Sequence, residues 1–265
     1  MAVSAYTGAA IFGGAGSETT AELRYVTVAE CAELQGIAVR SERRLAPVRG
    51  LSLTAGDGER LPAGGELGRY ADGRRLTVDA PAVFFSGCDG YEALCPELLS
   101  GLSVPSLQGL MNGGPKGGDG GRLVADYVWY FAALADADSA LPEDGGCRVL
   151  FDGFESAVPA RLLSVSAAAD GKRAVLLRLT CGGEAYLSLR RTGARLISAE
   201  YSGLEIPNAA IRDGGDGGKF VRVISAGRRT DAELDIIYQG EGFSIAAADS
   251  GPDGLREGGT VLLDN

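Results

Sequence analysis

Histidine is absent from all 265 residues of this sequence. Without imidazole the chain cannot build a Ser-His-Asp triad, a Cys-His dyad, a histidine-containing zinc site or an imidazole general base. Five cysteines are present, but none are spaced as a C-x-x-C pair or as zinc ligands. We therefore expect a protein that is not an enzyme, with no catalytic, cofactor-binding or metal-binding residues.

The cysteines leave one question open. Cys88 and Cys95 are the only close pair, and a disulfide between them is compatible with the sequence without being required by it. An odd total leaves at least one thiol free. We expect most of the five to be small buried hydrophobic residues, as free cysteines commonly are.

Basic residues are also too few for a nucleic-acid partner. The net charge is −10, and no stripe of Lys and Arg with interleaved aromatic residues occurs. The electrostatic footprint of a nucleic-acid-binding surface is therefore missing.

Long hydrophobic runs are lacking too. The weakly apolar segment Ala2–Ala15 would cover only about 21 Å as a helix, whereas a bilayer core is about 30 Å thick, so it cannot span a membrane alone. Two interpretations stay open for residues 1–24: the trailing end of a membrane anchor that begins before this chain, or an N-terminus of small residues without structure.

Glycine, in contrast, is abundant, with 41 residues. The glycines cluster in Gly-Gly, Asp-Gly and Gly-Asp pairs between short apolar runs, which is typical of hairpin turns. Examples are Ala71–Gly73, Ala169–Gly171 and Asp213–Gly215. The sequence therefore predicts a mainly β protein.

Several β modules follow one another along the chain. Turn glycines across Val48–Gly68 predict a flattened sandwich of tight hairpins. From Leu123 to Tyr201, five or six short strands predict a compact barrel, with a short helix at Ala135–Leu141. Trp129 and Tyr130 begin the barrel in an alternating run, so we expect one of the two to fill its core rather than to form a stacking platform for sugars. Between these modules, Pro96 and Pro105 each predict the start of a short helix.

The hairpin sandwich resembles a biotinyl/lipoyl-like domain. In a true carrier, a lysine at the tip of the central hairpin holds the cofactor. That tip would fall near Tyr70–Arg75, which contains no lysine, since the chain's only lysines are Lys116, Lys172 and Lys219. We therefore expect no covalent cofactor.

Four short stretches of the chain resemble parts of one protein family, and they occur along the chain in the same order as in that family. Gly203–Ile211 is similar to the "glycine-leucine-x-valine-proline-x-x-alanine-isoleucine" border of the HlyD-type membrane fusion proteins, the periplasmic adaptor subunits of efflux and secretion transporters. Trp129–Ala132 is similar to the opening of their barrel. Asp89–Glu92 with Pro96–Leu98 resembles Gram-positive, clostridial-type members. The long helical hairpin of the family, which docks to a channel, is missing here.

The resemblance implies a multi-domain adaptor architecture. Its expected parts are the N-terminal segment 1–24, a lipoyl/barrel-sandwich-like domain at 25–86, short helices with a Gly-rich linker at 87–121, a β-barrel at 122–211 and a membrane-proximal β domain at 212–265.

The same resemblance implies a non-catalytic coupling role in a transporter or secretion system. The implied partners are a membrane transporter, of the ABC permease/ATPase type, and further copies of the chain on the membrane. The implied location is the cell surface, with the full-length protein anchored in the membrane. The alternative from the residues alone is an extracellular β-domain that binds a ligand or a cell-wall polymer without a pump.

Overall fold

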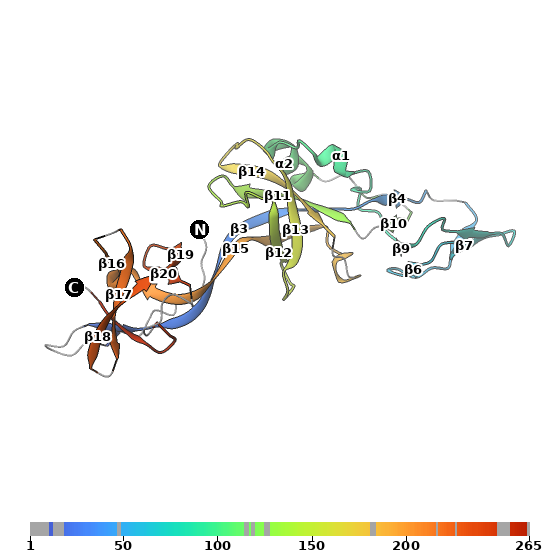
Figure 1. The fold of residues 1–265 in the computed structure, drawn as a ribbon. Helices are drawn as coiled ribbons and strands as arrows, with labels where there is room; N and C mark the ends of the chain where they lie inside the picture. The colour runs from blue at the N-terminus through green and yellow to red at the C-terminus, as the bar shows by residue number, and fades with distance from the viewer. Residues whose placement is uncertain are drawn as a thin grey trace. The chain divides into compact units, whose positions relative to one another are not determined.

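The computed structural model describes residues 11–12, 19–46, 49–113, 117, 120–124, 128–180, 184–215, 217–225, 227–247 and 255–263 (Figure 1). The fold is mainly β, as the sequence predicts. It forms two compact units, Cys31–Ser198 and a second that combines Met1–Glu30 with Ala199–Asn265. Among the described residues, no helix is long and apolar enough to cross a membrane.

A closed six-stranded barrel is the centre of the first unit. Its strands are β12 (Gly146–Phe151), β13 (Val158–Val165), β14 (Lys172–Leu179), β11 (Trp129–Asp136), β3 (Arg24–Val39) and β15 (Arg191–Pro207), in this order around the sheet. The ring closes where β15 pairs with β12, from Arg148 opposite Ile197 to Phe151 opposite Ala194. The expected barrel is confirmed.

Alternation along β11 explains how this barrel is filled. Trp129, Phe131, Ala133 and Ala135 point into one core, whereas Tyr130, Ala132 and Leu134 belong to another on the outside. Inside, Phe131 meets Phe151 edge to face at 5.1 Å, and Trp129 lies 5.3 Å from the same ring. Trp129 is only 2% exposed, so it fills the core and is no sugar platform.

Two helices cover the outer face of β11 and β14. They are α1 (Pro96–Leu99) and α2 (Val104–Asn112), which confirms both expected helices (Figure 1). The Ser103 side chain caps α2 by accepting a hydrogen bond from the backbone N–H of Ser106. Val104 and Leu107 then pack on Leu176 of β14 within the outer core.

Gly36 is where β3 and β11 come closest. A Cβ at this position would lie 2.4 Å from the backbone oxygen of Ala132 and 2.6 Å from the Cβ of Ala133. The sequence alone predicts a strand over 26–39 that is broken at Gly36, because glycine weakens a strand. That prediction is wrong: β3 is continuous, and the glycine allows the close approach of β11.

Two small sheets extend from the barrel strands and enclose one core between them. One sheet contains β4 (Glu42–Arg44), β10 (Arg122–Val124), β9 (Ala82–Phe85) and β6 (Arg60–Leu61); the other contains β5 (Leu51–Leu53), β7 (Glu66–Tyr70) and β8 (Arg75–Thr77). Leu61, Leu67, Val78, Phe84 and Leu123 are buried between them. A tight turn with Gly73 at φ 85° joins β7 to β8.

The second unit is a separate β module. Its main sheet has the order β1 (Ile11–Phe12), β2 (Thr20–Glu22), β21 (Thr260–Leu262), β17 (Lys219–Ser225), β16 (Arg212–Asp213), with β18 (Arg228–Leu234) also paired to β17. The last residues of β15 pair here with β20 (Phe243–Ala246), which pairs with β19 (Ile236–Gln239). Leu23, Ile206, Val221 and Val261 are buried in its core.

Some local expectations differ from the structure. The expected helix at 135–141 is not formed, because β11 continues to Asp136 and then turns. Residues 184–186 form a 3₁₀ turn within the stretch Leu123–Tyr201, for which the sequence predicts short strands in succession. Gly203, at the start of the expected border between modules, lies within β15, which ends only at Pro207, whose missing N–H suits a strand end.

The sheets also divide the chain at other places than the expected domains. Residues 35–39 of β3 belong to the barrel rather than to the hairpin sandwich, because they pair with β11. Conversely, β10 belongs to a small sheet and not to the barrel, because it pairs with β4 and β9. Of the expected N-terminal segment 1–24, residues 1–10 and 13–18 lie outside the described residues, and so do residues 114–116 and 118–119 of the expected Gly-rich linker.

Replacement of Trp129 by Ala should destabilise the barrel unit strongly. The change removes the largest side chain of the core, and such truncations cost about 3–5 kcal/mol. Urea unfolding followed by circular dichroism measures the change. Trp129→Phe, which keeps a ring beside Phe151, should cost clearly less; equal losses for both variants would contradict the packing described here.

A pair of glycine substitutions should have opposite effects. Gly36→Ala should lower the free energy of unfolding by about 1–3 kcal/mol, because its methyl group would overlap β11. Gly109→Ala, in α2 with no atom within 4 Å of the added carbon, should raise it by about 0.4–1 kcal/mol. Thermal unfolding of the two variants beside the parent protein tests both signs.

Candidate functional site

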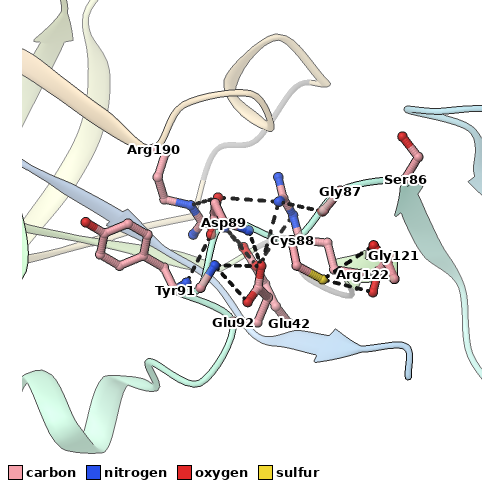
Figure 2. Close-up of polar contacts among 12 residues, drawn as sticks. Glu42, Ser86, Gly87, Cys88, Asp89, Tyr91, Glu92, Gly121, Arg122 and Arg190 are labelled. Atoms are coloured by element: carbon pink, nitrogen blue, oxygen red, sulfur yellow. Dashed lines mark hydrogen bonds and ion pairs between the residues drawn. The ribbon is translucent and has the colours of Figure 1, made fainter. Parts of the chain in front are cut away.

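The loop after β9 folds on its own acidic side chains. The Glu92 carboxylate accepts hydrogen bonds from the backbone N–H of Asp89 at 2.6 Å and of Gly90 at 3.1–3.2 Å. Asp89 in turn accepts the N–H of Tyr91 at 3.0 Å. Gly90 has φ 90°, which glycine adopts without strain. The loop thus holds two carboxylates in fixed positions (Figure 2).

Arg190 joins this loop to two other segments. Its Nε donates to Asp89 Oδ2 at 2.7 Å, and its Nη2 donates to both oxygens of Glu42 at 2.7 and 2.8 Å (Figure 2). A further bond reaches the backbone oxygen of Ala38 at 3.1 Å. The side chains of Arg190 and Glu42 are 13% and 2% exposed, so this ion pair is largely shielded from water.

Arg122 approaches the same carboxylates from β10. Its Nη1 donates to the oxygen of Gly87 at 2.9 Å and to Asp89 Oδ2 at 3.3 Å. Its Nε lies 3.6 Å from Glu42 Oε2, and its guanidinium stacks 4.9 Å from the ring centre of Phe85. One carboxylate oxygen of Asp89 is therefore shared by two guanidinium groups.

Arg40 supplies a third positive charge at the inner end of the network. It donates to the backbone oxygens of Leu189, at 2.9 Å, and Tyr186, and lies over the Trp129 ring. Burial, together with the neighbouring charge of Arg190, lowers the pKa of Arg40 to about 10. It remains charged at neutral pH, so three guanidinium groups balance the three carboxylates.

The balance shifts the pKa values of both central partners. Burial alone would raise the pKa of Asp89, but the hydrogen bond from the Tyr91 backbone and the charges of Arg190 and Arg122 outweigh it, so the pKa lies below its usual value. Burial alone would lower the pKa of Arg190, yet Glu42 and Asp89 raise it. Each group is therefore held in its charged form.

This chemistry does not suit a metal ion or a nucleophile. Oxygen atoms of Glu42, Asp89 and Glu92 lie within 4.8 Å of one another, as metal ligands would. Arg190, Arg122 and backbone N–H groups already use these oxygens, however, so a cation would have to displace them. Burial and the charge of Glu92 raise the pKa of the Cys88 thiol, which disfavours the thiolate.

Sequence reasoning missed this network. The expected Asp89–Glu92 stretch supplies two of its carboxylates, but Glu42, Arg122 and Arg190 were not singled out. Glu42 stands among charged neighbours in the sequence (Arg40–Arg44), so no local pattern marks it as part of a buried network. Cys88 and Cys95 carry free thiols, so the disulfide left open by the sequence is not formed.

A cavity of about 600 Å³ lies beside the network and shares Glu42 and Glu92 with it. Its lining comes from the start of β4, the residues before β9, the segment from Glu92 to Glu97, and the end of β10 with the start of β11. Its lining combines apolar side chains with several charged groups.

Comparison with known proteins gives a weak likeness to solved structures alone. No model of a protein family matches the chain, and no curated protein matches it. Among solved structures, the crystal structure of ZneB from Cupriavidus metallidurans is similar over 93% of this chain and 92% of that chain, with a TM-score of 0.34 and 13% sequence identity. A likeness at this level carries no argument about function.

Stability should fall in acid because of Asp89. Its pKa is lower in the folded than in the unfolded chain, so its carboxylate stabilises the fold above the ordinary value of 3.8. That contribution is lost as the pH falls below 3.8 and through the folded pKa. Asp89→Asn should lower the free energy of unfolding at neutral pH by about 1–3 kcal/mol, a moderate amount because the Asp89 side chain is partly exposed. The variant should also lose less stability in acid than the parent protein, because the titrating carboxyl group is gone.

Urea unfolding between about pH 7 and about pH 2 measures both effects. The matched control is Asp136→Asn, which breaks the exposed ion pair with Lys172 (2.6 Å) and should cost no more than about 1 kcal/mol. If the free energy of unfolding falls as steeply with decreasing pH in Asp89→Asn as in the parent protein, Asp89 does not cause the loss of stability in acid.

Proposed function

We propose that this chain is the extracytoplasmic part of an adaptor subunit for a membrane transporter or secretion system, with a structural coupling role and no catalysis of its own. The observation that carries the proposal is the order of its modules. The stretches that resemble the HlyD-type membrane fusion proteins follow one another in the order of that family: Asp89–Glu92 with Pro96–Leu98, then Trp129–Ala132, then Gly203–Ile211.

The way the chain passes through its modules supports this proposal. β2 pairs with β21 in the second unit, so both ends of the described chain lie in one sheet. β3 enters the barrel that β11–β15 complete, and β4 enters the small sheet that β10 completes. Each module is thus nested within the next: the small sheets form between β3 and β11 of the barrel, and the barrel forms between β2 and β21 of the second unit.

The chemistry of the buried groups is consistent with a mechanical role. The carboxylates and guanidinium groups around Arg190 neutralise one another and connect segments, and none is held as a proton donor or as an activated nucleophile. In a coupling protein such a network would keep the barrel and the small sheets in register while force passes between them.

The finer parts of the proposal follow the sequence resemblance. They are membership of the Gram-positive, clostridial-type branch of the HlyD family without its helical hairpin, an ABC-type permease and ATPase as the partner, and self-association of the chain on the membrane. The location proposed is the outer face of the cell, with the full-length protein anchored in the membrane.

Photo-crosslinking in the native host tests the proposal. A photoreactive amino acid replaces Leu53, which is 44% exposed in the small sheets, or Ile237, which is 37% exposed in the second unit. We expect irradiation to join the full-length protein to an integral membrane transporter subunit or to a further copy of itself. Unirradiated cells are the control.

Mass spectrometry identifies the products. Recovery of the protein from the culture medium or the cell wall, with crosslinks only to polymer or to no protein, would reject the adaptor role. The same result would support the alternative of an extracellular binding domain.

A further inference from the structure

Three aromatic rings form a run on the strands β15, β20 and β19 of the second unit. The ring of Tyr238 lies between the other two, with its centre 5.2 Å from that of Tyr201 and 6.2 Å from that of Phe243. All three residues are half-buried, so each keeps part of its surface in contact with solvent. The run therefore offers apolar ring surface to a ligand.

Glu205 projects from the same side of these strands. It lies opposite Ile245 of β20, and Ile245 lies opposite Tyr238 of β19. Register partners share one face of a sheet, and so do residues two or four positions apart on a strand, which adds Phe243 and Tyr201. The carboxylate and the three rings therefore belong to one face, called the aromatic face below.

The Glu205 carboxylate has no partner in the part of the chain that the structure describes. The residue is only 8% exposed, yet it makes no hydrogen bond and no ion pair there. Burial raises its pKa and outweighs the nearby charge of Arg24, which acts in the opposite direction. Arg24 likewise makes no hydrogen bond or ion pair with the described residues. Because buried polar groups normally have partners, this unused carboxylate points to a ligand.

The chemistry of these groups selects a sugar. A carboxylate only accepts hydrogen bonds and a guanidinium only donates them, so a ligand that serves both must donate and accept. Their opposite charges offset each other, which favours a neutral ligand. Sugar hydroxyl groups both donate and accept, and the C–H groups of a sugar ring form an apolar surface that fits an aromatic ring. We propose that the aromatic face binds a neutral saccharide, whose ring stacks on the tyrosine rings and whose hydroxyl groups bond to Glu205 and Arg24.

This inference does not depend on the adaptor role, because it rests only on residues of the second unit. Calorimetric titration of the whole chain with neutral tetrasaccharides of β-linked glucose, α-linked glucose, mannose and N-acetylglucosamine tests it. We expect at least one to bind saturably, with a Kd of about 1 mM or tighter. Tetragalacturonate, with a carboxylate on each ring, should bind more weakly, because the chain carries a net charge of −10. No binding of any neutral tetrasaccharide, or equal binding of tetragalacturonate, would overturn the proposal.

A matched pair of tyrosine variants locates the site. Tyr238→Leu removes the central ring of the aromatic face and should weaken binding of the best tetrasaccharide at least about fivefold. Tyr25→Leu removes a tyrosine that is 48% exposed in the same unit. Tyr25 follows Arg24 directly in β3, so it projects from the opposite face, and its loss should leave binding unchanged. Equal affinities for both variants would place any binding elsewhere and reject the proposal.

Glu205→Gln separates binding from folding. The variant should bind the tetrasaccharide about tenfold more weakly, because hydrogen bonds to a charged acceptor are the stronger ones. Its melting temperature should equal or exceed that of the parent chain, because burial disfavours the carboxylate and no partner is lost. A lower melting temperature would show that Glu205 serves the fold instead, and unchanged affinity would show that it does not touch the ligand. Either result would reject the proposal.

Saturation-transfer difference NMR on the parent chain gives a readout that needs no variant. A sugar ring stacked on tyrosine receives saturation mainly through the C–H groups of the side that faces the aromatic ring. We therefore expect the protons on one side of the bound ring to be saturated more strongly than those on the other. Equal saturation of both sides would exclude stacking and overturn the proposal.

Discussion

The connection between the barrel and the small sheets depends on one guanidinium group. Arg190 reaches the backbone of β3, the Glu42 carboxylate of β4 and the Asp89 carboxylate of the loop after β9. A charge with so little exposure is tolerable only while both carboxylates remain, because an unpaired buried ion costs several kcal/mol. The loop, the two helices that follow it and the wall of the cavity therefore depend on the same set of contacts.

Local chemistry made part of this structure predictable. Pro96 and Pro105 mark helices because proline suits a helix start, and Gly73 and Gly171 mark hairpins because they adopt positive φ. The burial of Trp129 follows from alternation along its strand. In each case the signal and the structure lie within a few residues of one another.

The rest could not be predicted because it depends on contacts between distant segments. Gly36 resembles a strand breaker until the carbonyl of Ala132 is placed against it. The strand through Gly203 is fixed by its pairing with β20, about 40 positions further along the chain, and not by local preference. The network around Arg190 joins charges whose partners no local pattern specifies.

Nesting of the modules has a consequence for synthesis on the ribosome. The small sheets are complete once β10 emerges, and the barrel once β15 does, but β2 must wait for β21. Thr20 and Leu262 are register partners almost a whole chain length apart, and such long loops close slowly. The first unit can thus mature early, while the edge of β2 that pairs with β21 remains open to premature association until β21 has been synthesised.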